Sequence, residues 1–88
     1  MERAVITVTG MDRTGIVASI SNTLAENDVN ILDIRQTIMD DLFTMIMLVD
    51  ISKIDFIKLK EELDKLGEKI GVKIIAQHED IFRYMHRI

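Results

Sequence analysis

The loop Gly10–Gly15 carries the clearest chemical potential in the chain. It separates a run of β-branched residues from a run with helical spacing, so it should lead into a helix N-terminus. The backbone N–H groups and the positive dipole end found there attract anions, and a carboxylate or phosphate could bind. The same residues could equally serve only to connect a strand to a helix. No Lys-Ser or Lys-Thr pair follows Gly15, so a nucleotide-hydrolysing phosphate loop is excluded.

Other reactive residue types do not form a catalytic pattern. His78 and His86 lie near the C-terminus with no Ser close by, and the chain has no Cys to activate. The acidic pair Asp40-Asp41 and the run His78-Glu79-Asp80 supply too few converging ligands for a divalent ion. We therefore predict no enzyme activity, no metal site and no cofactor.

The composition limits the class of protein. Its 88 residues are 48% hydrophobic and 30% charged, which predicts one folded domain spanning residues 1–88. The net charge of −4 lacks the basic footprint of a nucleic-acid or anionic-membrane partner. Aromatic residues total 5%, which also disfavours base stacking. No apolar run approaches the roughly 18–20 residues that span a bilayer, and neither disulfides nor a signal pattern is present, so we expect a cytoplasmic location.

Hydrophobic periodicity predicts seven elements. The segment 30–39 alternates, with Leu32, Ile34 and Ile38 on one face, as in a half-buried strand. The segment 42–51 is apolar on both faces, as in an interior strand that is covered on both sides. The expected order is a strand at Arg3–Thr9, a helix at 16–27, strands at 30–39 and 42–51, a helix at about 55–69, a strand at 72–77 and a short helix over 79–88.

This βαββαβ order predicts an α+β, ferredoxin-like sandwich. Right-handed crossovers place both long helices on one face of a four-stranded antiparallel sheet, with the first and third strands in the middle and a short C-terminal helix at the end. Apolar residues on the other face then need a cover, and so short a chain has little left to supply one. A second copy of the chain is the economical cover, so we predict a homodimer.

Two stretches of sequence resemble a known module. The runs 5–17 and 24–34, with the pattern Asp-Arg-x-Gly-Ile, a helix and then Val-Asn-Ile, resemble the opening of the ACT domain, a regulatory amino-acid-binding module. The hairpin 36–45 is similar to small free-standing ACT proteins of prokaryotes, which are related to the halves of the glycine-cleavage-system repressor. The resemblance implies a ligand at the seam between the first loop of one domain and the second strand of its neighbour.

The resemblance also implies roles for particular residues. Asp12 would accept from a ligand ammonium, Gly15 would let ligand and backbone approach closely, and the amide of Asn30 would contact the carboxylate or amine. Each also has a structural interpretation, as part of a turn or a helix start. Backbone N–H groups would hold the carboxylate, which completes the expected ligand-binding set: Met11, Asp12, Arg13, Thr14, Gly15, Ile16 and Asn30.

The leading hypothesis is a regulatory module that binds an amino acid as a homodimer and signals to an unidentified effector protein in trans. An allosteric mechanism would require two states with different ligand contacts. One alternative is a dimerisation scaffold that binds protein without a ligand. Another is a small acylphosphatase-like enzyme, which would use Arg13 in the loop and an Asn on a neighbouring strand.

Overall fold

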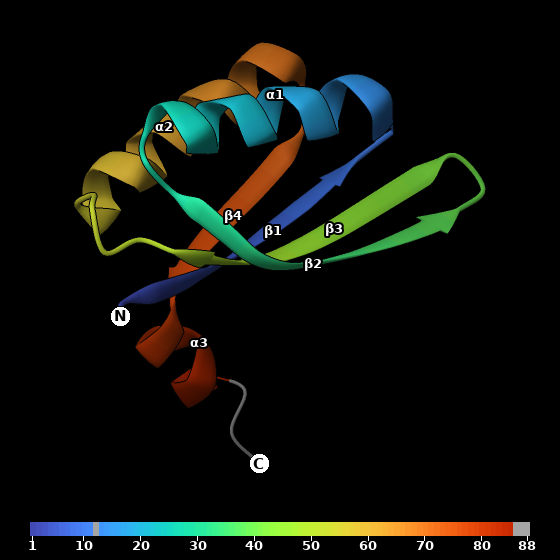
Figure 1. Cartoon of the computed structure of the whole chain (residues 1–88). Coiled ribbons are helices and arrows are strands. Elements are labelled where there is room, and N and C mark those ends of the chain that lie inside the picture. Colours follow the sequence, from blue (N-terminus) through green and yellow to red (C-terminus); the bar gives the residue numbers. More distant parts are fainter. Residues whose placement is uncertain (12, 86–88) are drawn as a thin grey trace.

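The computed structural model describes residues 1–11 and 13–85, which form a four-stranded sheet with two long helices on one face (Figure 1). The sheet order is β2-β3-β1-β4 and every neighbouring pair is antiparallel. The predicted ferredoxin-like fold is therefore confirmed. The elements are β1 (Arg3–Gly10), α1 (Arg13–Glu26), β2 (Asn30–Met39), β3 (Leu42–Asp50), α2 (Phe56–Ile70), β4 (Lys73–His78) and α3 (Glu79–Met85).

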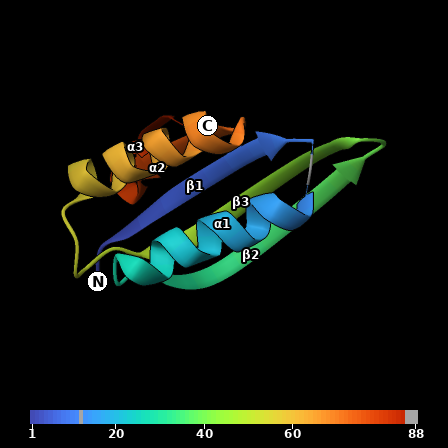
Figure 2. The ribbon, with the colours of Figure 1, turned by 90° about the horizontal axis from the view of Figure 1, so that it is seen from above.

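The two long helices run in opposite directions above the sheet, with α1 over the β2 side and α2 over the β4 side (Figure 2). Helix α2 ends where its sequence predicts, at Gly71, whose φ of 73° is left-handed. The Gly71 N–H donates to the Gly67 carbonyl at 2.9 Å. Helix α1 begins at Arg13, three residues earlier than its apolar spacing predicts, because its first turn carries no apolar residue before Ile16.

The hairpin between β2 and β3 closes as predicted, with Met39 opposite Leu42. Asp40 lies at φ 56°, in the left-handed region that short polar side chains tolerate better than most. This residue supplies the turn conformation that a glycine would otherwise provide.

The hydrophobic core lies between the sheet and the two long helices. Alternate residues of β1 and β3 point into it, and the apolar stripes of α1 and α2 face them. The fully buried large side chains are Ile6, Val8, Ile20, Leu24, Phe43, Met45, Met47, Val49, Ile51, Leu59 and Leu63.

Strand β2 departs from its prediction. It is an edge strand whose residues are exposed except for the half-buried Ile34, and the hairpin at its far end extends past the ends of the helices (Figure 1). A register shift between Ile31 and Asp33 also removes Leu32 from the predicted alternation and leaves it 44% exposed.

The helix-free face of the sheet is partly covered by the chain itself, which was expected to have little left to supply a cover there. Helix α3 lies below the sheet, on the side opposite α1 and α2 (Figure 1). Val5 is only 8% exposed, and it lines a small space together with Phe82 of α3. Ile46 and Ile75, farther along the same face, stay 38% and 43% exposed. Strand β3 is thus interior as predicted, but one chain covers only one of its faces fully.

Candidate functional site

The loop after β1 is shaped by a close approach at Gly10. Gly10 lies opposite Phe43 at one end of the sheet. A Cβ at Gly10 would lie 2.7 Å from a methyl carbon of Ile16 and 2.7 Å from one of Val72. Glycine therefore lets the end of β1 pack directly against α1 and the turn after α2.

The structure gathers most of the sequence-predicted ligand residues at the start of α1. Met11 is 66% exposed, while Thr14 and Gly15 are exposed within the first turn. Ile16 is 4% exposed because its side chain joins the core, so only its backbone remains for a ligand. Arg13 is the first residue of α1. Asp12 lies outside the described residues.

A cavity of about 310 Å³ lies beside this loop, between the N-terminus of α1 and the C-terminus of α2. Helix dipoles make the first of these ends positive and the second negative. A zwitterion could therefore direct its carboxylate to one helix and its ammonium to the other. The cavity wall is otherwise mainly apolar, and its residues are Met11, Gly15, Ile16, Ser19, Ile70, Gly71 and Val72.

Asn30 does not join these residues within one chain. It lies opposite Asp50, whereas Gly10 lies opposite Phe43, seven residues away along β3. At about 3.3 Å per residue, the two ends of the sheet are about 23 Å apart. Asn30 instead borders a separate cavity of about 270 Å³ with Asp28 and Lys53.

The carboxylate beside Asn30 is already engaged. Asp50 Oδ1 accepts from the Ser52 hydroxyl at 2.6 Å and from the Ser52 backbone N–H at 2.9 Å. These bonds lower the pKa of Asp50 because they favour its ionised form. A carboxylate held in this way is a poor general base, since its proton affinity is reduced.

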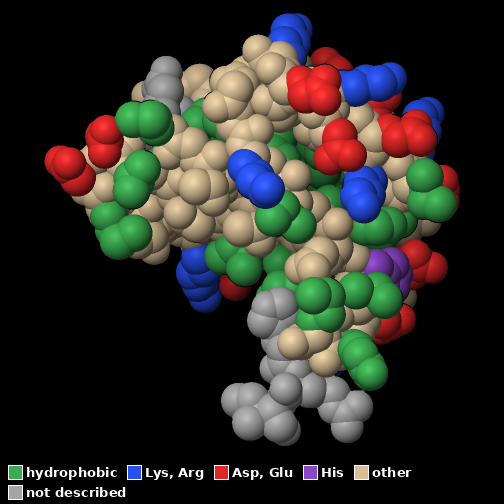
Figure 3. Space-filling view, turned by 180° about the vertical axis from the view of Figure 1, so that it is seen from behind, with side chains coloured by type: hydrophobic (Ala, Val, Ile, Leu, Met, Phe, Trp, Pro, Cys, Tyr) green, Lys and Arg blue, Asp and Glu red, His purple; other side chains and the backbone are tan. Residues whose placement is uncertain are grey.

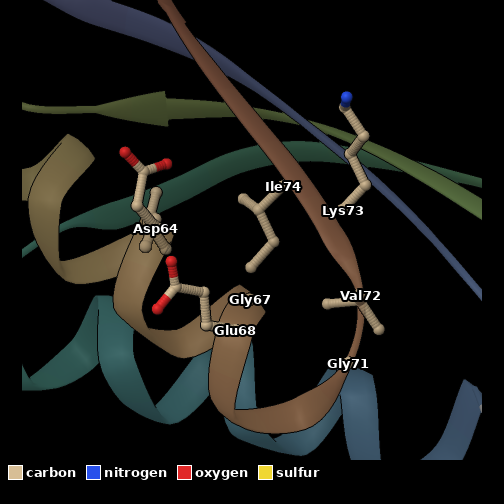
Figure 4. A pocket seen from close by; sticks show the side chains of 8 residues that line it. Asp64, Gly67, Glu68, Gly71, Val72, Lys73 and Ile74 are labelled. Atoms are coloured by element: carbon tan, nitrogen blue, oxygen red, sulfur yellow. The ribbon is translucent and has the colours of Figure 1, made fainter.

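A further hollow of about 590 Å³, which the sequence did not predict, lies between α2 and β4 (Figure 4). Asp64 and Glu68 project over it from α2, and Lys73 points away (Figure 4). Gly67 forms part of its wall, and a Cβ there would lie 2.9 Å from the Val72 carbonyl oxygen. A glycine within the helical pattern was the signal for this close approach.

His78 joins the sheet to α3. Its Nδ1 accepts from the Asp80 backbone N–H at 3.2 Å, and its ring makes an edge contact with Phe56 at 5.9 Å. The carboxylates of Glu2 and Asp80 lie 3.6 and 3.8 Å from its two nitrogens. These contacts give His78 a structural role at the start of α3. His86 lies outside the described residues.

Within residues 1–11 and 13–85, no three His, Asp or Glu side chains converge as a metal site would require. None of the helices described is long and apolar enough to cross a membrane.

Comparison with known proteins shows the family. The ACT domain profile matches residues 2–77. A UPF0237 protein of Methanocaldococcus jannaschii is 69% identical over the full length of both chains. The solved structure of an ACT domain protein from Streptococcus pneumoniae has a TM-score of 0.82 at 44% identity, covering 92% of this chain and 93% of that one. A protein described as a glycine cleavage system transcriptional repressor has a TM-score of 0.78 at 26% identity, covering 88% of this chain and 44% of that one. The chain thus belongs to the ACT domain family.

Proposed function

We propose that this protein is a regulatory module that binds an amino acid as a homodimer and passes the signal to a separate effector protein. The observation that carries the proposal is the cavity between the α1 N-terminus and the α2 C-terminus. It offers opposite dipole ends to the two charges of an amino acid, together with an apolar wall for a side chain. The regulatory role named for the similar repressor supports the same conclusion.

A homodimer would bring Asn30 and the loop together, although they lie apart within one chain. Strand β2 is an exposed edge ten residues long, and such an edge can pair with another strand. Antiparallel pairing of β2 with β2 of a second copy would bring the second copy's Asn30 to the end where β2 finishes. Because Met39 and Gly10 both lie at that end of the sheet, Asn30 would then approach the loop.

Catalysis of the acylphosphatase type receives no support from the sheet. That chemistry would require an Asn on a strand beside the loop-bearing β1. The neighbours of β1 are β3 and β4, both fully described, and neither contains an Asn. We therefore propose binding, without a chemical step.

Isothermal titration of the full chain against the twenty amino acids tests the proposal. We expect binding by at least one of them. Ser19→Leu should weaken it at least tenfold because the larger side chain fills the cavity that Ser19 lines. Ala18→Leu, an exposed neighbour on the same helix, is the matched control and should bind normally. Absence of binding across the whole panel would leave the scaffold hypothesis instead.

The contribution of Asn30 from a second copy has a separate test. Asn30→Ala should weaken binding of the same amino acid if the second copy's Asn30 reaches the loop. Asn22→Ala, at an exposed position on α1, should not change it. Normal affinity in Asn30→Ala would confine the site to one chain and remove the dimer from the binding mechanism.

A further inference from the structure

The helix-free face of the sheet has an uncovered apolar region next to α3. Thr7 on β1 lies opposite Ile46 on one side and Ile75 on the other, so these three residues form a row across the face. The next row toward the Arg3 end contains Val5, and α3 covers it. Ile46 lines the same small space as Phe82, yet Ile46 and Ile75 stay 38% and 43% exposed, so α3 covers this row only in part.

Helix α3 also leaves most of its own apolar side chains exposed. Its Phe82 side chain faces the sheet and is half-buried. The other three apolar side chains, Ile81, Tyr84 and Met85, are 55%, 75% and 63% exposed. Hydrophobic side chains gather around this helix in the view from behind (Figure 3). We call Ile46, Ile75, Ile81, Tyr84 and Met85 together the α3 corner.

We infer that the α3 corner binds the α3 corner of a second copy of this chain, with the two α3 helices side by side and antiparallel between the two sheets. The area supports this occupant. The five side chains are 38–75% exposed, which for residues of these sizes is on the order of 600 Å² of total surface, whereas a standard interface buries about 800 Å² per partner. A patch of this size is at the upper end for a monomer.

The charges of α3 favour a symmetric partner as well. A two-fold contact presents the same surface twice, so it needs both signs of charge within one patch. Helix α3 carries one exposed acid, Asp80, and one exposed base, Arg83, whose side chains are 86% and 68% exposed. An antiparallel pair of α3 helices would place Asp80 of each copy near Arg83 of the other, and like charges would not meet.

This interface is separate from the β2 seam, meaning the antiparallel pairing of β2 with β2 of a second copy proposed above. It does not depend on a ligand. The α3 corner lies on the face of the sheet, while the seam uses its β2 edge. Both can form together, in which case the assembly is a tetramer. Either interface can also form without the other.

Sedimentation equilibrium of the full chain without any amino acid tests the inference. We expect Tyr84→Glu and Ile75→Glu each to halve the mass of the wild-type assembly, because a charge would be buried at the contact. Ile57→Glu is the matched control, since Ile57 is 65% exposed on α2, outside the corner. It should keep the wild-type mass. Circular dichroism confirms that each variant is folded, and two variants on different elements guard against a local defect.

Equal masses for the corner variants and the control, or a monomeric wild type, would overturn the inference. The corner would then face solvent or a different partner, such as a lipid surface. Titration of Tyr84→Glu with amino acids separates this result from the proposed function. A halved mass with no amino-acid binding by any form would support the corner while refuting the sensor. Normal binding with an unchanged mass would do the reverse.

Discussion

The two faces of the sheet use the same strands, yet they are packed very differently. Along β3, Met45 and Met47 face the long helices and are at most 1% exposed. Ile46, between them, is 38% exposed on the opposite face. The hydrophobic pattern shows that both faces need a cover, but it does not show how far each cover reaches. One face has two helices of 14 and 15 residues, whereas the other has one of seven.

The covers are also held by different interactions. The long helices pack through a continuous apolar core. Helix α3 is held by Phe82 and by the ion pair between Glu79 and Arg3 of β1, in which Glu79 Oε2 accepts from Arg3 Nε at 3.0 Å. Arg83 donates to Glu79 Oε1 at 2.8 Å within the helix itself. Partly exposed ion pairs contribute little free energy. Helix α3 should therefore open before the rest of the molecule.

The two faces should differ most in how much stability is lost when an apolar residue of β3 is truncated. Phe43→Ala, on the covered face, should lower the free energy of unfolding by about 3–5 kcal/mol, because it leaves a cavity in the core. Ile46→Ala, on the open face, should lower it by less than about 1 kcal/mol, since the side chain is already partly exposed. Urea denaturation at low protein concentration measures both.

Protein concentration sharpens this comparison. If the α3 corner pairs two copies, the cost of Ile46→Ala should increase with concentration, while that of Phe43→Ala should not depend on it. Equal costs for the two changes at low concentration would mean that the two faces are packed alike.

The packing of α3 against the helix-free face of the sheet should depend on Phe82. Phe82→Ala should free α3 from the sheet at a cost of about 1–2 kcal/mol, because it exposes Val5 and leaves mainly ion pairs. Amide hydrogen exchange should become faster in α3 and remain unchanged in α2. Ile57→Ala, at an exposed site on α2 outside the α3 corner, is the control and should leave exchange in α3 unchanged. Uniform acceleration in both helices would show that α3 is part of the main cooperative unit.

A smaller change in stability is expected at Gly67, on the face of the sheet that the long helices cover. Gly67→Ala would normally stabilise a helix interior by about 1 kcal/mol. Here the new Cβ would lie 2.9 Å from the Val72 carbonyl oxygen, so we expect a net loss of about 1 kcal/mol. Thermal unfolding measures it. Glu68→Ala, at the next and exposed position of α2, should change stability little, and a stabilised Gly67→Ala would refute the close approach.

The sequence was sufficient to predict the elements and their order, because periodicity and turn residues are local signals. Most of the residues that it predicts to bind a ligand lie at the start of α1 for the same reason. It could not show that Ile70 and Val72 border the same cavity as Gly15, because this depends on tertiary packing. The exposure of β2 was missed since alternation does not reveal that a strand lies at the edge of its sheet or carries a register shift.

The smallest effect should appear in the pH dependence of the hydrogen-exchange protection of α3. The bonds from Arg3 lower the pKa of Glu79 below its ordinary value of 4.5. The folded state therefore binds this proton less tightly than the unfolded state does. The stabilisation is present above pH 4.5 and is lost as the pH falls through the folded value. Exchange protection factors of α3 should thus decrease at acidic pH more than those of α2. Glu79→Gln should start with weaker protection and lose this dependence, whereas an unchanged pH profile in Glu79→Gln would assign the effect to another carboxylate.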